Sequence, residues 1–405
     1  MENGGQTLAS VYYDAPYEAN GHSFRNWWGS RGYLGYSNIR DGIIYSMNIV
    51  AVRTLMETVT PQMGAAFAES LGITSLTSQD ITASLALGGL TQGVSNLELT
   101  AAYGAIANGG TYVRPVFFTR ILDRNGRVLL ENEPEERRGM QESTAFLLTD
   151  AMEDSLEPHQ IFARAQMAPI QATSTRARLE RMAAAGKSGT TTDNRDAWFV
   201  GFIPYYTAGI WTGFDDNNRG LSNTNYHKTI WKNIMERIHE ELPTAQFQPP
   251  EDVVQVSVCR KSGKLAVPGL CDHDPRGSCV YTEYFARGTE PQEVCDVHVS
   301  AEICSETGLL AGEYCPDRVQ GVFMVVPQGE TAVTDDSLFT MPSPCTVHGP
   351  GTGTEGESPA AETGSPGPAA GSSGLPAGSS GRSAGPGGVQ ENEGREETVS
   401  PWPME

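Results

Sequence analysis

The amino-acid sequence predicts an α/β fold of the α+β type, in which an antiparallel sheet is flanked by helices. Helical patterns recur through the first 155 residues, strand-like segments follow near residue 200, and one more helical pattern closes this part of the chain. Helices that precede and follow a compact group of strands are typical of an antiparallel sheet with helices packed against it.

The first helices are predicted from residues that favour helix ends. Residues 62–71 form a short helix that Gly72 closes. Ser95 and Glu98 have the spacing of a capping box, which predicts that the next helix begins there and runs to the glycine pair at Gly109.

The remaining elements follow from apolar spacing and turn residues. Residues 121–129 are predicted to form a hairpin around an Asn-Gly turn, and residues 141–153 to form a helix. The apolar face of that helix comprises Ala145, Leu148 and Met152. Strands are expected over 198–203 and 207–214. A final amphipathic helix is indicated by Ile230, Ile234 and Ile238.

The composition limits the possible partners. A length of 405 residues suggests two or three domains, and a net charge of −21 argues against nucleic acid as a partner. The sequence has no run of 18 apolar residues, and its first thirty residues do not have the pattern of an export signal. We therefore expect neither a membrane span nor a signal peptide within it.

Changes in composition divide the chain into three parts. Residues 1–245 are predicted to form one globular unit, and a proline-containing linker then opens a cysteine-rich module at 246–348. Residues 349–405 are rich in Gly, Ser, Pro, Ala and Glu, with hardly any branched apolar residue. Such a segment cannot bury enough apolar surface to become ordered, so this tail is expected to be disordered.

All the cysteines lie in the cysteine-rich module, and their chemistry has two interpretations. They are Cys259, Cys271, Cys279, Cys295, Cys304, Cys315 and Cys345. Cys295-x-x-His298 and Cys345-x-x-His348 resemble pairs of zinc ligands, but no Cys-x-x-Cys occurs, and structural zinc sites usually combine two close pairs. Confinement of the cysteines to one segment favours disulfides in an oxidising compartment over a metal site.

The cysteine-rich module contains an internal repeat. Residues 258–266 match residues 303–311, and each copy continues to a further cysteine and ends in Cys-x-Val-His. A unit of roughly forty residues buries little core, so a covalent staple is expected in each. We predict the bridges Cys259–Cys271, Cys304–Cys315 and Cys279–Cys295, with Cys345 free.

Lys187, one of five lysines, lies in a short polar motif before the first predicted strand. The motif is Gly186-Lys187-Ser188-Gly189-Thr190-Thr191. Phosphate-binding loops of nucleotide enzymes share Gly-Lys-Ser, but such a loop follows a strand, opens a helix and requires a glycine where Arg181 stands. Because the order of elements is reversed here, we exclude a nucleotide site.

A second short motif, Ser46-Met47-Asn48, lies far upstream. Alone, Ser-x-Asn indicates no more than a helix end with two polar side chains bonded to the backbone. Serine acyltransferases that handle β-lactams combine Ser-x-x-Lys, Ser-x-Asn and Lys-[Ser/Thr]-Gly. Together with Lys187, the Ser46 motif therefore indicates an acyl-transfer site.

With these motifs, the chain resembles the C-terminal part of the transpeptidase domain of class A (bifunctional) penicillin-binding proteins. The matching stretches follow the family's order and lie at 46–53, 86–94, 101–110, 186–191, 196–204 and 211–215. The cysteine repeat resembles C-terminal extensions of some Gram-positive members. The resemblance implies a transpeptidase-like fold, no cofactor, and the joining of peptidoglycan stem peptides through a serine acyl-enzyme.

The resemblance also implies catalytic roles. Ser46 would relay a proton, and Lys187 would lower the local cost of negative charge. Asn48 would hydrogen-bond the amide backbone of the substrate.

Substrate binding is implied for the strand that follows Lys187. The hydroxyls of Ser188 and Thr190 would bind the terminal carboxylate, and the Thr190 amide would be one donor of an oxyanion hole. Gly189 would let the acyl peptide lie along the strand, with Thr191 beside it. The alternative is that Ser188 and Thr190 are simply exposed strand residues.

The sequence departs from the family in lacking Ser-x-x-Lys. The residues three positions before the lysines are Ala184, Asn225, Thr229, Val258 and Lys261. The resemblance puts the missing element just before Met1, and the family's glycosyltransferase domain and membrane anchor further upstream. We therefore expect a C-terminal fragment of a protein anchored at the extracytoplasmic face of a bacterial membrane, with no covalent binding of β-lactams until the nucleophile is restored.

Two other functions stay open. One is a D,D-carboxypeptidase or β-lactamase of the same fold. The other is a non-catalytic fragment that binds peptidoglycan.

Overall fold

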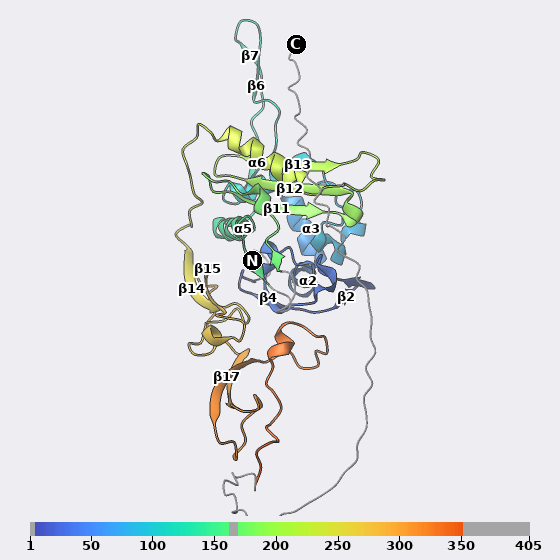
Figure 1. Cartoon of the computed structure of the whole chain (residues 1–405). Helices are drawn as coiled ribbons and strands as arrows, with labels where there is room; N and C mark the ends of the chain where they lie inside the picture. Colours follow the sequence, from blue (N-terminus) through green and yellow to red (C-terminus); the bar gives the residue numbers. More distant parts are fainter. Residues whose placement is uncertain (1–4, 162–168, 351–405) are drawn as a thin grey trace, which may run out of the picture. The chain divides into compact units, whose positions relative to one another are not determined.

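The computed structural model describes residues 5–161 and 169–350 (Figure 1). These described residues belong to one compact unit. The predicted disordered tail lies almost wholly outside the described residues. Within them, no helix has the length and apolar character needed to cross a membrane.

The central feature is a three-stranded antiparallel sheet. Its strands are β11 (Ala185–Thr190), β12 (Asp196–Phe202) and β13 (Thr207–Gly213), in that order across the sheet. The predicted strands near residue 200 are therefore confirmed. The Gly-Lys-Ser-Gly motif forms β11, where Lys187 pairs with Val200 and Gly189 with Trp198.

Helices cover both faces of this sheet, as the predicted α+β class requires. The helix α6 (Tyr226–Ile238) lies on one face, above the sheet in Figure 1. The other face packs against α4 (Asn96–Ala107) and α5 (Glu142–Asp154).

Side chains of β12 alternate between the two faces of the sheet, and both faces are packed. Phe199 packs edge-on against Trp231 of α6, with ring centroids 5.1 Å apart. Phe202 points to the other side, where it is buried with Met152 of α5. Successive side chains of a strand point to opposite faces, so one seven-residue strand contributes to both layers of the core.

The buried face of α6 differs from the prediction. Ile230, Ile234 and Ile238 are 41%, 38% and 45% exposed. His227, Trp231 and Met235 are buried instead. The buried stripe is thus displaced by one residue, or about 100° of helix rotation. The indole of Trp231 decides the face, because its Nε1–H donates to the carbonyls of Gly201 and Ala208 in the sheet.

The other predicted helices are confirmed, with one change at a cap. The short helix is α3 (Pro61–Ser70). At the start of α4, the Ser95 hydroxyl accepts from the Glu98 N–H at 3.2 Å, as expected. The Glu98 carboxylate accepts from the Thr74 hydroxyl rather than from the Ser95 N–H. The capping box is therefore incomplete, because Glu98 bonds to the distant Thr74 instead of to the backbone of Ser95.

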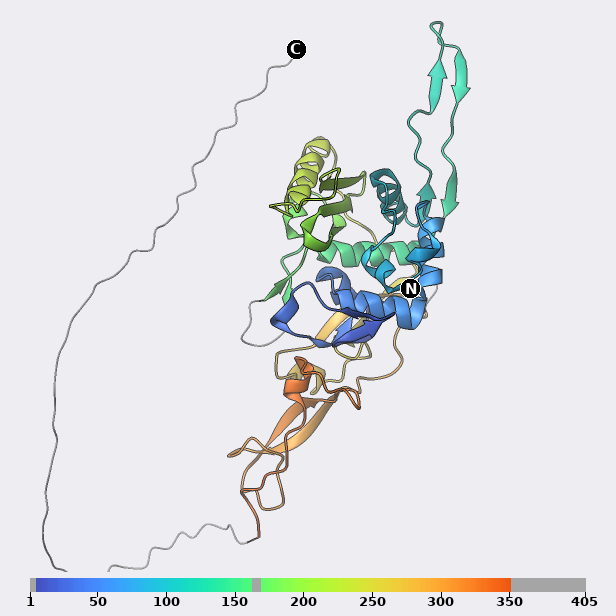
Figure 2. The ribbon, with the colours of Figure 1, turned by 90° about the vertical axis from the view of Figure 1, so that its right-hand side faces the viewer.

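The predicted hairpin comprises β6 (Arg120–Leu122) and β7 (Val128–Glu131), and it stands clear of the body in Figure 2. Its loop spans residues 123–127 and is longer than the expected two-residue turn. Asp123 Oδ1 accepts from the N–H groups of Asn125 and Arg127 at 2.8 and 2.9 Å, which closes the longer loop.

Apart from single 3₁₀ turns, the remaining elements described within residues 1–245 are short. They are β1 (Val11–Asp14), β2 (Tyr17–Ala19), β3 (His22–Phe24), β4 (Gly35–Asn38), α1 (Ile39–Ile44), α2 (Asn48–Thr54), a π-helical turn (Leu55–Val59), β5 (Thr111–Val113), β8 (Glu136–Arg138), β9 (Gln160–Ile161) and β10 (Ile170–Gln171). The helices α1 and α2 flank Ser46.

The cysteine-rich module contains two antiparallel hairpins, one in each repeat. The first pairs β14 (Val253–Cys259) with β15 (Val280–Ala286), and the second pairs β16 (His298–Cys304) with β17 (Arg318–Met324). None of the three predicted disulfides is formed, because all seven cysteines are free. Six of them lie in two groups of three, each with a histidine, rather than in pairs.

A buried ion network joins the first repeat to the rest of the unit. Arg40 of α1 donates to Glu283 of β15 at 2.8 and 2.6 Å, and to Asp150 and Asp154 of α5 at 2.5 and 2.6 Å. The Glu283 side chain is fully buried, and that of Arg40 is 7% exposed. Three elements from distant parts of the sequence therefore meet at one guanidinium.

Candidate active site

Ser46 lies between α1 and α2 in a strained backbone position. Its φ is +53°, in the left-handed region that residues other than glycine adopt rarely. Tyr45 and Met47 on either side are buried in one apolar cluster, and the Met47 N–H donates to the Gly42 carbonyl at 2.9 Å. Buried neighbours on both sides fix the direction of the Ser46 hydroxyl, and such strain is typical of functional positions.

The structure brings Ser46 into contact with Lys187, which is 141 residues away in the sequence. Lys187 Nζ donates to Ser46 Oγ at 2.8 Å and to the Ser188 carbonyl at 3.0 Å. Ser46 thus accepts from an ammonium group, and its own hydroxyl proton is free to be donated elsewhere.

The position of Lys187 lowers its pKa. Burial removes water from the ammonium group and the charge of Lys228 lies nearby, so the pKa of Lys187 falls to about 8. The pKa of Lys228 also falls to about 8, because of its burial and then because of Arg176. Two lysines with lowered pKa values at one place are typical of a functional site.

Lys228 joins the candidate site residues, and the sequence reasoning did not select it. Its Nζ donates to the Thr173 carbonyl at 2.9 Å and to Asn225 Oδ1 at 3.3 Å. Ser188 Oγ donates to the same Thr173 carbonyl at 3.5 Å. The only feature of the sequence that could have drawn attention to Lys228 is the scarcity of lysine, and it applies equally to Lys187.

Asn48 is the first residue of α2, two positions after Ser46. Its side-chain Nδ2–H donates to the Arg25 carbonyl at 2.9 Å. This bond orients the amide and leaves its Oδ1 available as an acceptor. Asn48 is therefore only two residues along the chain from the Ser46–Lys187 contact, and its side chain donates to Arg25.

The predicted substrate residues follow Lys187 along β11. Ser188 and Thr190 share one face of the strand, which suits joint binding of one carboxylate. A Cβ atom at Gly189 would meet only ordinary contact with Trp198, so the fold itself does not require glycine there. The Thr191 hydroxyl accepts from the Asp196 N–H at 2.8 Å, so this residue closes the turn between β11 and β12.

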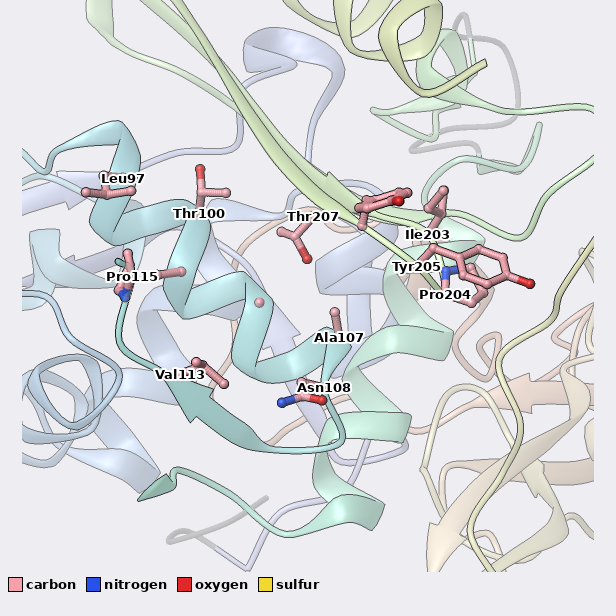
Figure 3. A pocket seen from close by; sticks show the side chains of 13 residues that line it. Leu97, Thr100, Ala107, Asn108, Val113, Pro115, Ile203, Pro204, Tyr205 and Thr207 are labelled. Atoms are coloured by element: carbon pink, nitrogen blue, oxygen red, sulfur yellow. The ribbon is translucent and has the colours of Figure 1, made fainter. Parts of the chain in front are cut away.

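A groove of about 860 Å³ borders this turn. One wall is the loop of residues 88–94, and the other includes Thr191, Trp198 and Trp211. A second pocket, of about 460 Å³, lies between α4 and the β12–β13 turn, lined by Leu97, Thr100 and Tyr205 among others (Figure 3). Its lining holds no carboxylate, histidine, lysine or cysteine, and it includes none of the candidate site residues selected from the sequence.

The pKa of Lys187 gives a testable pH dependence. With lysines ¹³C-methylated, we expect Lys187 and Lys228 to titrate near pH 8, while Lys264, whose carboxylate partners raise its pKa, titrates well above them. The Lys228→Met change removes a neighbouring charge and is expected to raise the pKa of Lys187. The matched change Lys232→Met on the same helix is expected to leave it unchanged. An unchanged Lys187 titration in Lys228→Met would contradict the coupling.

The same lowered pKa has a consequence for stability. Lys187 gives up its proton at a lower pH in the folded protein than in the unfolded chain. Between about pH 8 and the ordinary lysine value the unfolded chain binds more protons, so the contribution of Lys187 to stability rises with pH in that window.

Comparisons with known proteins find two matching family models and several relatives. The family model described as the penicillin binding protein transpeptidase domain matches residues 1–236, and that of the penicillin-binding protein 1A C-terminal domain matches residues 249–300. The chain is similar to penicillin-binding protein 1A of Clostridium botulinum, with 36% identity over 288 residues, covering 70% of this chain and 33% of that protein. Penicillin-binding protein 1A/1B of Bacillus subtilis is 30% identical over 315 residues, covering 73% and 32%.

One solved structure supports the fold. The crystal structure of penicillin-binding protein 1A from Haemophilus influenzae matches with a TM-score of 0.60 and 24% identity, covering 73% of this chain and 47% of that one. The predicted transpeptidase-like fold is therefore confirmed. The chain spans about a third of the length of the curated relatives named above.

Proposed function

The chain belongs to the penicillin-binding protein transpeptidase family, and on that premise we propose that it forms part of the active site of a peptidoglycan D,D-transpeptidase. The reaction joins two stem peptides through a serine acyl-enzyme at the extracytoplasmic face of the cell membrane. The observation that carries the proposal is the 2.8 Å hydrogen bond from Lys187 Nζ to Ser46 Oγ, because it unites the Ser-x-Asn and Lys-Ser-Gly elements at one point.

Proton transfer is the proposed role of this pair. Attack by a serine releases a proton, and the departing D-Ala amine must gain one. Charged Lys187 has only donors, so Ser46 accepts from it and keeps its own O–H for the leaving amine. A pKa of about 8 keeps Lys187 charged at neutral pH and places it within reach of deprotonation.

Substrate binding is proposed along the free edge of β11. In the described part of the chain, β11 pairs only with β12, so its other edge has no strand partner. An extended peptide can add to such an edge through its main chain. The Thr190 N–H then serves as an oxyanion donor, the Ser188 and Thr190 hydroxyls bind the terminal carboxylate, and Gly189 leaves room for the acyl group.

The nucleophile is the part of the proposal that this sequence does not supply, because it contains no Ser-x-x-Lys. Incubation of the chain with fluorescent penicillin is therefore expected to give no covalent adduct. A version extended upstream to include a Ser-x-x-Lys element is expected to give one. An adduct on the chain of 405 residues would overturn this account of the nucleophile.

Lys187 can be tested in the extended version. Lys187→Ala removes a charged donor from the reacting centre and is expected to slow penicillin acylation by about 10²–10³-fold. Lys232→Ala is the matched control: its Nζ contacts the Arg178 carbonyl and Glu236 instead of Ser46, and acylation is expected to be unchanged. Equal rates for the two variants would contradict the role of Lys187. Supplying a D-Ala-D-Ala peptide with and without an acceptor amine separates the transpeptidase from a carboxypeptidase.

A further inference from the structure

Two clusters of three cysteines and one histidine lie in the cysteine-rich module. The first cluster comprises Cys259, Cys271, Cys295 and His298, and the second comprises Cys304, Cys315, Cys345 and His348. In each, one ligand atom from every residue lies within 4.8 Å of the others. Three thiols and an imidazole facing one point are too many groups for a single disulfide.

The distances within the clusters suit tetrahedral coordination. His298 Nδ1 lies 3.4 Å from Cys259 Sγ and 3.3 Å from Cys295 Sγ, and His348 Nδ1 lies 3.5 Å from both Cys304 Sγ and Cys345 Sγ. Zinc bonds of about 2.3 Å to sulfur and 2.0–2.1 Å to nitrogen, at a tetrahedral angle, separate S and N by about 3.5 Å. The sulfur atoms converge as ligands around a shared centre.

The same backbone framework holds the first ligand in both repeats. Cys259 and Cys304 each end a strand, and their carbonyls accept from the N–H groups of Gly263 and Gly308 at 2.8 and 2.9 Å. Both glycines have φ of +69°, which allows the tight turn that folds the chain back over the sulfur.

The other two cysteines are also held alike. Cys271 Sγ accepts from the Val267 N–H at 3.2 Å, and Cys315 Sγ accepts from the Gly312 N–H at 3.3 Å. The N–H groups of the third cysteines donate to a leucine carbonyl two residues after the glycine of the turn: Cys295 to Leu265 at 2.9 Å and Cys345 to Leu310 at 2.8 Å. Backbone N–H donors to sulfur stabilise thiolates, and their recurrence in both repeats indicates a site built twice.

Each histidine is oriented by a carboxylate on its other nitrogen. His298 Nε2 is 2.9 Å from Asp274 Oδ2, both fully buried, and His348 Nε2 is 3.0 Å from Glu306 Oε2. Such a carboxylate fixes the tautomer that leaves Nδ1 free to bind a metal, the arrangement common around metal-ligating histidines. Arg276 in turn holds Asp274 at 2.8 and 2.7 Å, so the first cluster also has a fixed outer layer.

We propose that the cysteine-rich module binds two zinc ions, one in each Cys₃His cluster, as structural sites with no open position. Three thiolates and an imidazole are the ligands of structural zinc, and four protein ligands leave no place for substrate. The metal replaces the disulfides expected from the sequence as the staple of each small repeat.

Cys279 is not a ligand of either proposed site, although its Sγ lies within 4.8 Å of ligand atoms of His298 and Asp274 beside the first one. Its thiol contacts the Gly277 carbonyl at 3.9 Å, and the second repeat has no equivalent cysteine. Cys279→Ser is therefore a matched control: it removes a buried thiol from the same module without removing a ligand.

The test is the metal content of the full chain, purified without chelator and measured by elemental mass spectrometry. We expect two equivalents of zinc in the unmodified chain and in Cys279→Ser, and about one in Cys295→Ser and in Cys345→Ser. Cobalt(II) substitution is expected to give thiolate charge-transfer and tetrahedral d–d absorption, halved in each single-ligand variant. This signature reports coordination even where a variant is less stable.

Thiol counting distinguishes zinc from disulfides. After denaturation with chelator and without reductant, we expect seven reactive thiols per chain. Fewer than seven, with no zinc in the native protein, would overturn the proposal, as would iron in place of zinc or an unchanged zinc content in both ligand variants. The zinc proposal and the proposed function can be tested separately. If the upstream-extended version contains no zinc but is acylated by penicillin, the zinc proposal is wrong and the proposed function is unaffected.

Discussion

The Arg40→Met variant is expected to lose about 3–5 kcal/mol of folding stability, because the change leaves the buried carboxylate of Glu283 without its cation. Glu283 is fully buried, and Arg40 donates to it through two nitrogens. Asp150 and Asp154 of α5 lose the same partner. Methionine fills much of the volume but replaces no charge, so the loss measures the ion network rather than a cavity.

Equilibrium unfolding in guanidinium, followed by tryptophan fluorescence, provides the measurement. The control Arg120→Met removes an exposed pair with Glu131, whose atoms are 3.6 Å apart, and is expected to cost at most about 1 kcal/mol. Adding Glu283→Gln to Arg40→Met is expected to recover part of the loss, since the buried charge is then gone. Equal unfolding midpoints for Arg40→Met and Arg120→Met would show that the network contributes nothing.

Removing metal with a chelator is expected to unfold the cysteine-rich module while the β11–β13 sheet stays folded. Structural zinc contributes about 10–16 kcal/mol of apparent binding free energy in small domains, more than a repeat of this size can recover from its own core. The strands β14 to β17 should therefore lose amide protection in hydrogen exchange when the metal is removed, and should regain it on addition of zinc.

Tryptophan fluorescence can follow the rest of the protein separately from the cysteine-rich module. All six lie outside 246–348, and Trp231 reports directly on the packing of α6 against the sheet. We expect their emission to change little on chelation while the exchange of residues 253–259 and 298–304 rises steeply. Protected β14 and β16 strands in metal-free protein would rule out a structural role for the metal.

The candidate site residues were selected from short motifs in the sequence that a serine acyltransferase requires. Ser46, Asn48 and Lys187 were predicted from their types and spacing, and the structure brings Ser46 and Lys187 together. Lys228 was missed because the sequence around it predicts an amphipathic helix and nothing shows which distant carbonyl its ammonium group reaches. The buried face of α6 was misjudged for a similar reason: three isoleucines set the apolar pattern, but one indole with two carbonyl partners decides the contact.

The two Cys₃His clusters could not be predicted from the spacing of the cysteines in the sequence. The four members of each cluster come from a strand end, a turn, and the Cys-x-x-His segment that follows the hairpin, so their convergence depends on how each hairpin folds. Cys-x-x-His was the visible signal, and it was outweighed by the absence of Cys-x-x-Cys. The repeat also suggested disulfide pairs, because each copy has two cysteines close together in the sequence. The third cysteine of each cluster, Cys295 or Cys345, lies farther along the sequence, after the hairpin.

His298 completes the first cluster and is also the first residue of β16, the strand that opens the second repeat. It pairs there with Met324, which is buried in the same apolar cluster as Cys259 and Cys271. The two repeats therefore share a residue and have no spacer between them, so no cut in the backbone yields two complete copies. Any change in the zinc site of the first repeat therefore acts directly on the strand that begins the second repeat.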